Sequence, residues 1–302
     1  MAPLPPPRFT RLDFALYAAV IFAWGFSWIA MHYQVGVVEP EISVVWRFLL
    51  AAPVMFAVAF ARGERLRFPL RDHVSLLGLG VALFCTNFAL FYYGAKWIAS
   101  GLLAVIFSLA SVVNVWLGAL VLGAAVDRRV VLGGALGFAG VAAMFYPEIA
   151  GTRLDPHLLL GLALCVGGTL SFCSGNMISA RLQKRRLPVL AASAWAMLYG
   201  AAALAAFAGL RGQPFIVEWA FPYLAGLLYL ALVASVIAFA CYLTLLGRIG
   251  VDRAAYVTVM LPIVALAVST ALEGYRWTIP AGFGLAAVLA GNLLVLRAPR
   301  RR

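Results

Sequence analysis

The chain has 302 residues, of which 65% are hydrophobic and only 11% are charged, and its mean hydropathy is +0.99. A soluble domain of this length carries roughly a quarter of charged residues and about half of apolar ones, so the composition excludes a soluble protein and indicates an integral membrane protein. The net charge of +12 does not indicate a nucleic-acid-binding face, because the basic residues stand singly or in short groups between apolar runs.

Ten apolar runs are long enough to cross about 30 Å of hydrocarbon as helices that rise about 1.5 Å per residue. Short loops of polar and turn-forming residues connect them and leave no room for a soluble domain. The first run is too long for a signal-peptide core and has no small-residue cleavage site, so we expect it to remain attached. The predicted spans are 13–33, 41–61, 73–94, 99–122, 130–147, 157–180, 188–209, 221–245, 254–272 and 277–296.

The basic residues predict the orientation of these spans. Of the 23 Lys and Arg residues, eighteen fall in segments that are cytoplasmic if the N-terminus is inside, four fall on the opposite side, and Arg47 lies within a span. Cytoplasmic loops carry an excess of Lys and Arg, so both termini are predicted to be cytoplasmic. The four cysteines all lie inside apolar runs without metal-ligand spacing, which argues against a disulfide or metal role.

An internal match indicates that the chain contains a duplication. The stretches 95–123 and 246–274 align without a gap at an offset of 151, which places span four on span nine and span five on span ten. Each copy therefore holds five spans, and because five is odd the second copy must enter the membrane in the opposite orientation. The matching pairs include Ile98/Ile249, Ala104/Ala255, Gly123/Gly274, Gly133/Gly284 and Gly140/Gly291.

We therefore predict an all-α membrane protein of ten transmembrane helices in two inverted five-helix repeats. Inverted repeats of this kind are typical of carriers that work by alternating access, with the substrate held between the halves near the middle of the membrane. The predicted organisation is a cytoplasmic tail over 1–12, a first repeat over 13–147, a second repeat over 157–296 and a basic cytoplasmic tail over 297–302.

Several short motifs resemble the EamA-type family of drug/metabolite transporters. They are Trp24-Gly25-Phe26, Arg47-Phe48, the stretch from Asn87 to Lys96, the stretch from Arg248 to Tyr256, and Met260-Leu261-Pro262. The resemblance covers nearly the whole chain and, within the family, is strongest to the aromatic amino-acid exporters. It implies export of small metabolites across the bacterial inner membrane. The chain departs from the family pattern at Ser111, where a proline is expected, and at Gly123-Ala124, where Gly-Glu is common.

Arg47 is the one basic side chain well inside a span, about 9 Å deep at the helical rise. A charge in hydrocarbon is costly unless it pairs, faces water or reaches the surface. One interpretation is a structural clamp in which Arg47 reaches outward to Glu39 or Glu41. The other is an anchor for a substrate carboxylate in a central cavity.

No Asp or Glu lies at the centre of a predicted span, which argues against lipophilic cations as the main substrate. It also leaves no evident proton relay beyond His32 and His157, so we expect facilitated diffusion or coupling by a route outside these patterns. A stripe of small residues, Gly167, Ser171 and Gly175, indicates close helix packing or a pathway wall.

Buried amides and deep aromatic side chains are the remaining candidates for substrate contact. Amides in lipid need partners, and we expect helix-to-helix hydrogen bonds to account for at least half of them. Pro262 removes a backbone hydrogen bond and predicts a kink that could serve gating. The substrate-binding candidates are Trp24, Trp28, Phe84, Asn87, Phe88, Phe91, Ser111, Asn114, Ser171, Asn176, Trp195, Tyr242, Tyr256 and Pro262, with Arg47 as the charge anchor.

Motifs of nucleotide hydrolases, metalloproteases and serine hydrolases are absent from the sequence, so we expect no enzyme activity, no catalytic residues, no metal and no cofactor. The expected partners are a small-molecule substrate, with an amino acid favoured, and the lipid bilayer, with no nucleic acid, and the protein is expected to work as a monomer. The alternatives are a carrier of other small metabolites or neutral hydrophobic compounds, and a membrane-embedded enzyme or scaffold.

Overall fold

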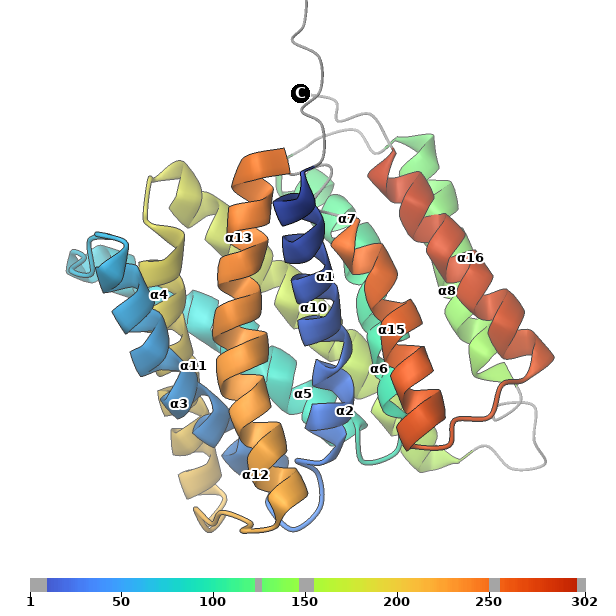
Figure 1. Cartoon of the computed structure of the whole chain (residues 1–302), viewed down its shortest axis with the longest axis horizontal. Helices are drawn as coiled ribbons and strands as arrows, with labels where there is room; N and C mark the ends of the chain where they lie inside the picture. Colours follow the sequence, from blue (N-terminus) through green and yellow to red (C-terminus); the bar gives the residue numbers. More distant parts are fainter. Residues whose placement is uncertain (1–9, 123–126, 147–154, 250–255, 298–302) are drawn as a thin grey trace, which may run out of the picture.

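The structure of the chain is a computed structural model that describes residues 10–122, 127–146, 155–249 and 256–297, where every regular element is a helix (Figure 1). The predictions for residues 1–9, Gly123-Ala124, the junction between the two halves, the motif residues 250–255 and the last five residues lie outside these ranges. The first half contains α1 (Arg11–Gly25), α2 (Ser27–His32), α3 (Pro40–Ala61), α4 (Leu70–Leu79), the π-helix η1 (Gly80–Thr86), α5 (Asn87–Gly94), α6 (Ser100–Ser108), α7 (Ala110–Leu122) and α8 (Arg128–Met144).

The second half begins with one long helix where the first half has α1 and α2. It contains α10 (Pro156–Lys184), α11 (Val189–Leu210), α12 (Phe221–Leu228), the π-helix η2 (Tyr229–Ile237), α13 (Ala238–Ile249), α15 (Val257–Leu272) and α16 (Ile279–Leu296).

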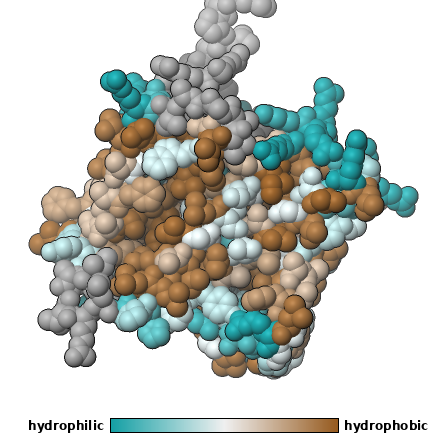
Figure 2. Space-filling model, turned by 180° about the vertical axis from the view of Figure 1, so that it is seen from behind, coloured by the Kyte–Doolittle hydropathy of each residue, from teal (hydrophilic) through white to brown (hydrophobic). Residues whose placement is uncertain are grey.

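Within the described residues, eight segments are long and apolar enough to cross a membrane, and each corresponds to a predicted span. The predicted fifth span corresponds to α8 with 17 residues, and the predicted ninth to α15 with 16 residues. The protein is therefore a multi-pass membrane protein, while the number of ten crossings stays a prediction. Large apolar side chains face outward along the helices, among them Phe60, Leu120 and Phe283, each more than 70% exposed. Figure 2 shows a largely hydrophobic middle between more hydrophilic ends.

Local sequence signals explain where the helices begin and end. Thr10 and Asp13 cap each other's backbone at the start of α1, and Asp155 caps α10. Pro40 stands in the first turn of α3, where its missing N–H is not needed. After α3, Gly63 adopts φ +71°, the left-handed conformation that ends many helices.

The start of α1 and the end of α16 lie at the same end of the helical bundle (Figure 1). We call this the basic end, because the loops there carry Arg residues such as Arg62, Arg65 and Arg128. At this end Arg248 donates to Asp13 over 2.5 Å and Arg185 pairs with Asp72. We call the other end of the bundle the opposite end.

From α4 onward the element boundaries of the two halves are related by the same offset of 151, whereas α3 and α11, which begin at Pro40 and Val189, are related by an offset of 149. Helix α4 begins at Leu70 and α12 at Phe221, and α8 begins at Arg128 and α16 at Ile279. The π-helix η1 starts at Gly80, and the equivalent position, Ala231, lies inside η2. A π-helix is rare and often marks a functional site, so its presence at the same place in both halves is a structural parallel that composition does not explain.

Helices α8 and α16 pack against each other through four glycines (Figure 1). A Cβ atom on Gly133 would lie 2.6 Å from the carbonyl oxygen of Gly291, and one on Gly140 would lie 2.5 Å from that of Gly284. The pairing runs in opposite directions along the two helices, so they are antiparallel. Gly284 is the offset equivalent of Gly133, and Gly291 is that of Gly140. Gly133 therefore contacts the equivalent of Gly140, and Gly140 contacts the equivalent of Gly133, which is the pattern that a two-fold axis produces.

Candidate substrate chamber

Arg47 lies on α3 with its side chain turned into the protein, and it is only 5% exposed. Its Nε and Nη2 atoms donate to the hydroxyl oxygen of Ser235 on η2, over 3.2 and 3.1 Å. Its guanidinium also stands over the ring of Phe88, 4.4 Å from the centroid. Among the described residues no carboxylate forms an ion pair with Arg47, so its charge is met by a hydroxyl and by aromatic faces.

The predicted clamp to Glu39 or Glu41 is not formed. Glu41 is fully buried and accepts a hydrogen bond over 2.8 Å from Arg211, which follows α11. Glu41 also accepts from the hydroxyl of Tyr93, and Glu39 pairs with Lys96 over 3.3 Å. The clamp prediction is wrong because these nearer cations occupy both carboxylates at the opposite end, while Arg47 turns toward the second half of the chain.

The group around Glu41 and Arg211 is a fixed charge pair at a helix end. The hydrogen bond from Arg211 to the Tyr93 hydroxyl, then the electrostatic interactions with Tyr93 and with the Glu41 carboxylate, raise the pKa of Arg211 above its ordinary value. A second group at this end forms around Glu273, which lies 3.2 Å from His32 and accepts from the hydroxyl of Ser100 over 2.7 Å. These contacts join α2, α6 and α15.

One group of aromatic rings lies beside the Arg47 guanidinium. Phe48 contacts Phe84 and Phe88 edge-on, with ring centroids 5.2 and 5.0 Å apart. Phe84 belongs to η1 and Phe88 to α5. Edge-on contacts of this kind stabilise aromatic clusters beyond their buried area. The rings thus form an apolar wall next to the buried charge.

A second aromatic group adjoins the first through the same face of α5. Phe91 contacts Trp28 and Phe107 at centroid distances of 5.4 and 5.6 Å, and Phe107 contacts Phe172 at 4.7 Å. Trp28 and Phe107 are themselves 5.6 Å apart. These four residues come from α2, α5, α6 and α10, so the group spans both halves of the chain.

Trp24 connects the wall to the second half. Its indole nitrogen donates to the carbonyl oxygen of Ala234 over 3.0 Å, and its ring lies 5.3 Å from that of Tyr242. Ala234 precedes Ser235, whose hydroxyl accepts the hydrogen bonds from Arg47. Toward the basic end, Tyr17 and Tyr242 pack against the same buried cluster as Trp24, and Tyr256 is the N-cap residue of α15. We call the region around Arg47, the two aromatic groups and Trp24 the aromatic chamber.

Two buried polar atoms beside this chamber have no hydrogen-bond partner among the described residues. They are Oδ1 of Asn87 and the hydroxyl of Tyr92. The Asn87 amide nitrogen donates to the Leu83 carbonyl oxygen of its own helix turn over 3.2 Å. A buried polar atom left without a partner costs about 1–3 kcal/mol, so each of these atoms is an available contact for a polar ligand or water. The Tyr92 hydroxyl is nevertheless close to Arg47 and interacts with its guanidinium, so Oδ1 of Asn87 is the freer acceptor of the two.

The other predicted candidates lie in contacts between helices. Ser111 donates to Oδ1 of Asn292 over 2.6 Å, and Asn176 donates to Asn114 over 3.3 Å. Ser171 donates to the Ala82 carbonyl oxygen over 2.7 Å, where α10 packs against η1. These bonds are of the helix-to-helix kind that we expected for at least half of the amides.

Trp195 and Pro262 stand apart from the aromatic chamber. The indole of Trp195 donates to the Leu66 carbonyl oxygen over 2.8 Å and lies against His73 and Tyr199 near the basic end. Pro262 is buried within α15, which the structure assigns as one helix from Val257 to Leu272. A kink at Pro262 remains a prediction.

Sequence reasoning missed Tyr92, Phe107, Phe172 and Ser235. Phe107 and Phe172 carry no spacing that distinguishes them from core residues, so no local pattern could have identified them. Ser235 did offer a signal, since it is the one serine in the apolar run of span eight. In the part of the chain that the structure describes, no three His, Cys, Asp or Glu side chains gather as metal ligands would.

Comparison with known proteins gives a family. The model of the EamA-like transporter family matches twice, over residues 13–146 and 151–297. The chain is 24% identical to the protein PagO of Salmonella typhimurium, over 86% of this chain and 84% of that protein. It is 25% identical to a probable amino-acid metabolite efflux pump of Escherichia coli, over 89% of each chain.

A solved structure, described only as the crystal structure of a protein, shares the fold with a TM-score of 0.68 and 18% identity, over 93% of this chain and 95% of that one. The family model matches almost the whole chain, and the helical bundle with its apolar exterior agrees with it. The chain therefore belongs to the EamA-like transporter family and is a membrane transporter.

Proposed function

We propose that this transporter exports small metabolites, first among them amino acids with aromatic or hydrophobic side chains, by alternating access through the aromatic chamber. The observation that carries the proposal is Arg47, a buried cation without a carboxylate partner among the described residues, beside a wall of phenylalanine rings. A guanidinium binds a carboxylate with strong, directional hydrogen bonds. The rings suit the apolar side chain of the same substrate.

A polar atom beside the aromatic chamber fits the other end of an amino acid. The substrate's ammonium group donates hydrogen bonds only, and Oδ1 of Asn87, which has no partner among the described residues, is an acceptor. The name of the Escherichia coli relative, a probable amino-acid metabolite efflux pump, supports the same substrate class.

Alternating access is supported by the relation between the halves. The antiparallel α8–α16 contact and the equivalent π-helices are what two inverted five-helix repeats would produce. We propose that the basic end faces the cytoplasm of a bacterial inner membrane, in agreement with the excess of Arg and Lys there. In the arrangement described, the Glu41–Arg211 and Glu273–His32 groups hold the opposite end together.

Competition in proteoliposomes tests the proposal. Labelled phenylalanine is loaded, and its efflux is measured while phenylalanine, phenylpropionate, phenethylamine or a cationic dye competes. We expect the two carboxylates to compete and phenethylamine, which lacks the carboxylate, to compete at least tenfold less well. If phenethylamine or the dye competes best, the proposed anchor is wrong and a carrier of hydrophobic compounds takes its place.

The Arg47→Lys variant separates the anchor from a plain positive charge. Lysine keeps the charge but cannot form the two-pronged contact of a guanidinium. We expect phenylalanine efflux to fall while the amount of folded protein in the membrane stays the same. Efflux equal to the wild-type rate, at equal protein amount, would count against a carboxylate anchor.

A further inference from the structure

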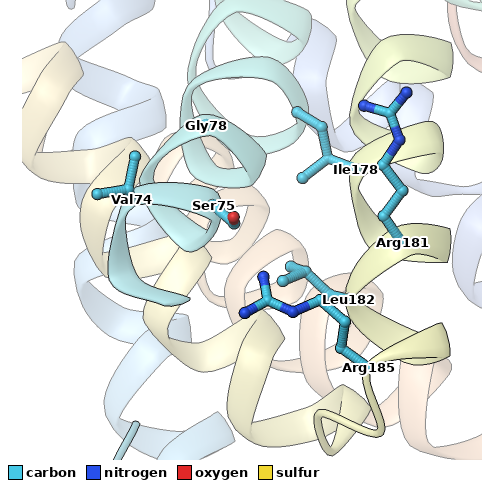
Figure 3. Close-up of a pocket in the computed structure, with 7 residues that line it drawn as sticks. All are labelled: Val74, Ser75, Gly78, Ile178, Arg181, Leu182 and Arg185. Carbon is cyan, nitrogen blue, oxygen red and sulfur yellow. The ribbon is translucent and has the colours of Figure 1, made fainter. Parts of the chain in front are cut away.

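A groove of about 360 Å³ lies near the basic end, between α4 and the last turns of α10 (Figure 3). Val74, Gly78, Ile178 and Leu182 form its apolar walls. Ser75, Arg181 and Arg185 supply its polar groups. Figure 3 shows Arg185 reaching from α10 toward α4.

The groove opens on the outside of the helical bundle, not into the aromatic chamber. Val74 is 69% exposed and Leu77 is 45% exposed on α4, and on α10 Leu170 is 45% exposed. Apolar side chains this exposed on membrane-spanning helices face lipid. A ligand in the groove is therefore in contact with the bilayer.

The polar part of the groove carries an excess positive charge. Arg185 pairs with the buried Asp72, which holds its side chain in place. Arg181 has no ion pair or hydrogen bond from its guanidinium among the described residues. Helix α4 begins here and α10 ends here, so the partial positive charge of one helix end opposes the partial negative charge of the other. The side chains therefore decide the sign of the net charge in the groove. The groove thus favours an anion.

Gly78 leaves the apolar part of the groove open. A Cβ atom at this position would lie 3.7 Å from Cδ1 of Ile178, an ordinary van der Waals distance. The glycine is therefore not required for close contact between the two helices, unlike Gly140 or Gly284. Its missing side chain instead provides room along the apolar wall.

We propose that this groove binds one anionic phospholipid, with the phosphate at Arg181 and Arg185 and an acyl chain along Val74, Gly78 and Ile178. The charge complements the headgroup, and the apolar wall continues from the headgroup site toward the middle of the membrane. Basic groups at the cytoplasmic face attract anionic lipids with about 1 kcal/mol per Lys or Arg. A soluble phosphate would use the two arginines but not the apolar wall.

Native mass spectrometry of the delipidated full-length chain in detergent tests this site. The probes are phosphatidylglycerol, phosphatidylethanolamine with the same acyl chains, and inorganic phosphate. We expect one phosphatidylglycerol to bind more tightly than phosphatidylethanolamine, and inorganic phosphate neither to bind stably nor to displace it. If phosphate displaces the lipid at equal concentration, the site is an anion site and the lipid assignment is overturned.

Three variants separate the groove from general surface charge. Arg181→Gln is expected to weaken phosphatidylglycerol binding about fivefold. Gly78→Leu is expected to weaken it as much by filling the apolar part, at unchanged charge. Arg128→Gln removes an exposed Arg at the same end, outside the groove, and should leave binding unchanged. The proposal fails if Arg128→Gln matches Arg181→Gln, or if Gly78→Leu, with an unchanged melting temperature, binds the lipid as the wild type does.

Discussion

The α8–α16 contact has the same residue type at offset-equivalent positions of the two halves, whereas the aromatic chamber has different ones. Gly133 and Gly140 meet Gly291 and Gly284. In the aromatic chamber the equivalents differ, as the following pairs show. On α3, where the offset is 149, Arg47 corresponds to Ala196, and at the offset of 151 Phe84 corresponds to Ser235, Asn87 to Ala238 and Phe91 to Tyr242.

The difference teaches what each region must do. A close contact between two equivalent helices needs a small residue on both sides, so both halves keep glycine. A site for one asymmetric molecule gains from unlike walls, since a carboxylate and an apolar ring need different partners. Ser235, the equivalent of Phe84, carries the hydroxyl that accepts a hydrogen bond from Arg47. The contact and the aromatic chamber are therefore expected to respond to mutation in different ways, in stability and in transport.

Gly140→Ala is expected to have the largest effect, on stability. Its Cβ would lie 2.5 Å from the Gly284 carbonyl oxygen and 2.9 Å from the Val288 backbone nitrogen, so α8 and α16 must move apart. Overpacking of this kind costs about 1–3 kcal/mol. We expect a lower melting temperature in detergent and less folded protein.

The matched control is Gly282→Ala on α16, where a Cβ atom would meet nothing within 4 Å. Both substitutions gain the same intrinsic helix propensity, so the difference between them isolates the packing effect. Equal melting temperatures of the two variants would show that the glycine contact is not what holds these helices together.

Arg47→Leu replaces the buried guanidinium with an apolar side chain. Replacing a buried charge by a hydrophobic residue is often neutral or stabilising, so we expect the protein to remain folded. A hydrogen bond to a charged group contributes about 1.5–3 kcal/mol, so phenylalanine efflux should fall roughly 10- to 100-fold. Efflux from proteoliposomes at matched protein amount measures the effect. Unchanged efflux in a folded variant would place substrate recognition away from Arg47.

The positions of the helices were largely predictable because the length of an apolar run is a local property. The predicted span 221–245 corresponds to α12, η2 and α13, for example. The face of Phe84, Asn87, Phe88 and Phe91 followed from helical spacing alone. All four lie at the aromatic chamber, but their role in binding stays a prediction.

The partners of that face could not be predicted, because they come from segments far away in the sequence. Arg47 donates a hydrogen bond to the hydroxyl of Ser235, which lies 188 residues away in the sequence. Asn114, Asn176 and Asn292 form hydrogen bonds across helices, and only the packing of α7, α10 and α16 brings their partners within reach. The π-helices were also missed, since their extra residue per turn leaves no mark on hydropathy.

Ser235→Ala tests the aromatic chamber with a smaller change. It removes the oxygen that accepts from Arg47 but leaves the charge, so the guanidinium loses one oriented contact. A hydrogen bond contributes about 1 kcal/mol, and we expect the apparent affinity for phenylalanine to weaken about fivefold. Ser174→Ala is the control, since that serine is exposed and donates to the Leu170 carbonyl oxygen of its own helix. Equal affinities of the two variants would contradict the role of Ser235.

Trp195→Phe is expected to have the smallest effect on transport, although sequence reasoning named Trp195 beside Trp24 and Trp28. Its indole donates to the Leu66 carbonyl oxygen, so phenylalanine keeps most of the ring contacts and loses one hydrogen bond. We expect a melting temperature a few degrees lower, from about 1 kcal/mol, and a change in phenylalanine efflux of less than about twofold. Trp28→Phe is the comparison, because the Trp28 ring contacts Phe91 and Phe107 within the aromatic chamber. If Trp195→Phe lowers efflux more than Trp28→Phe, the substrate path runs along α11 toward the basic end and the aromatic chamber is not the main binding region.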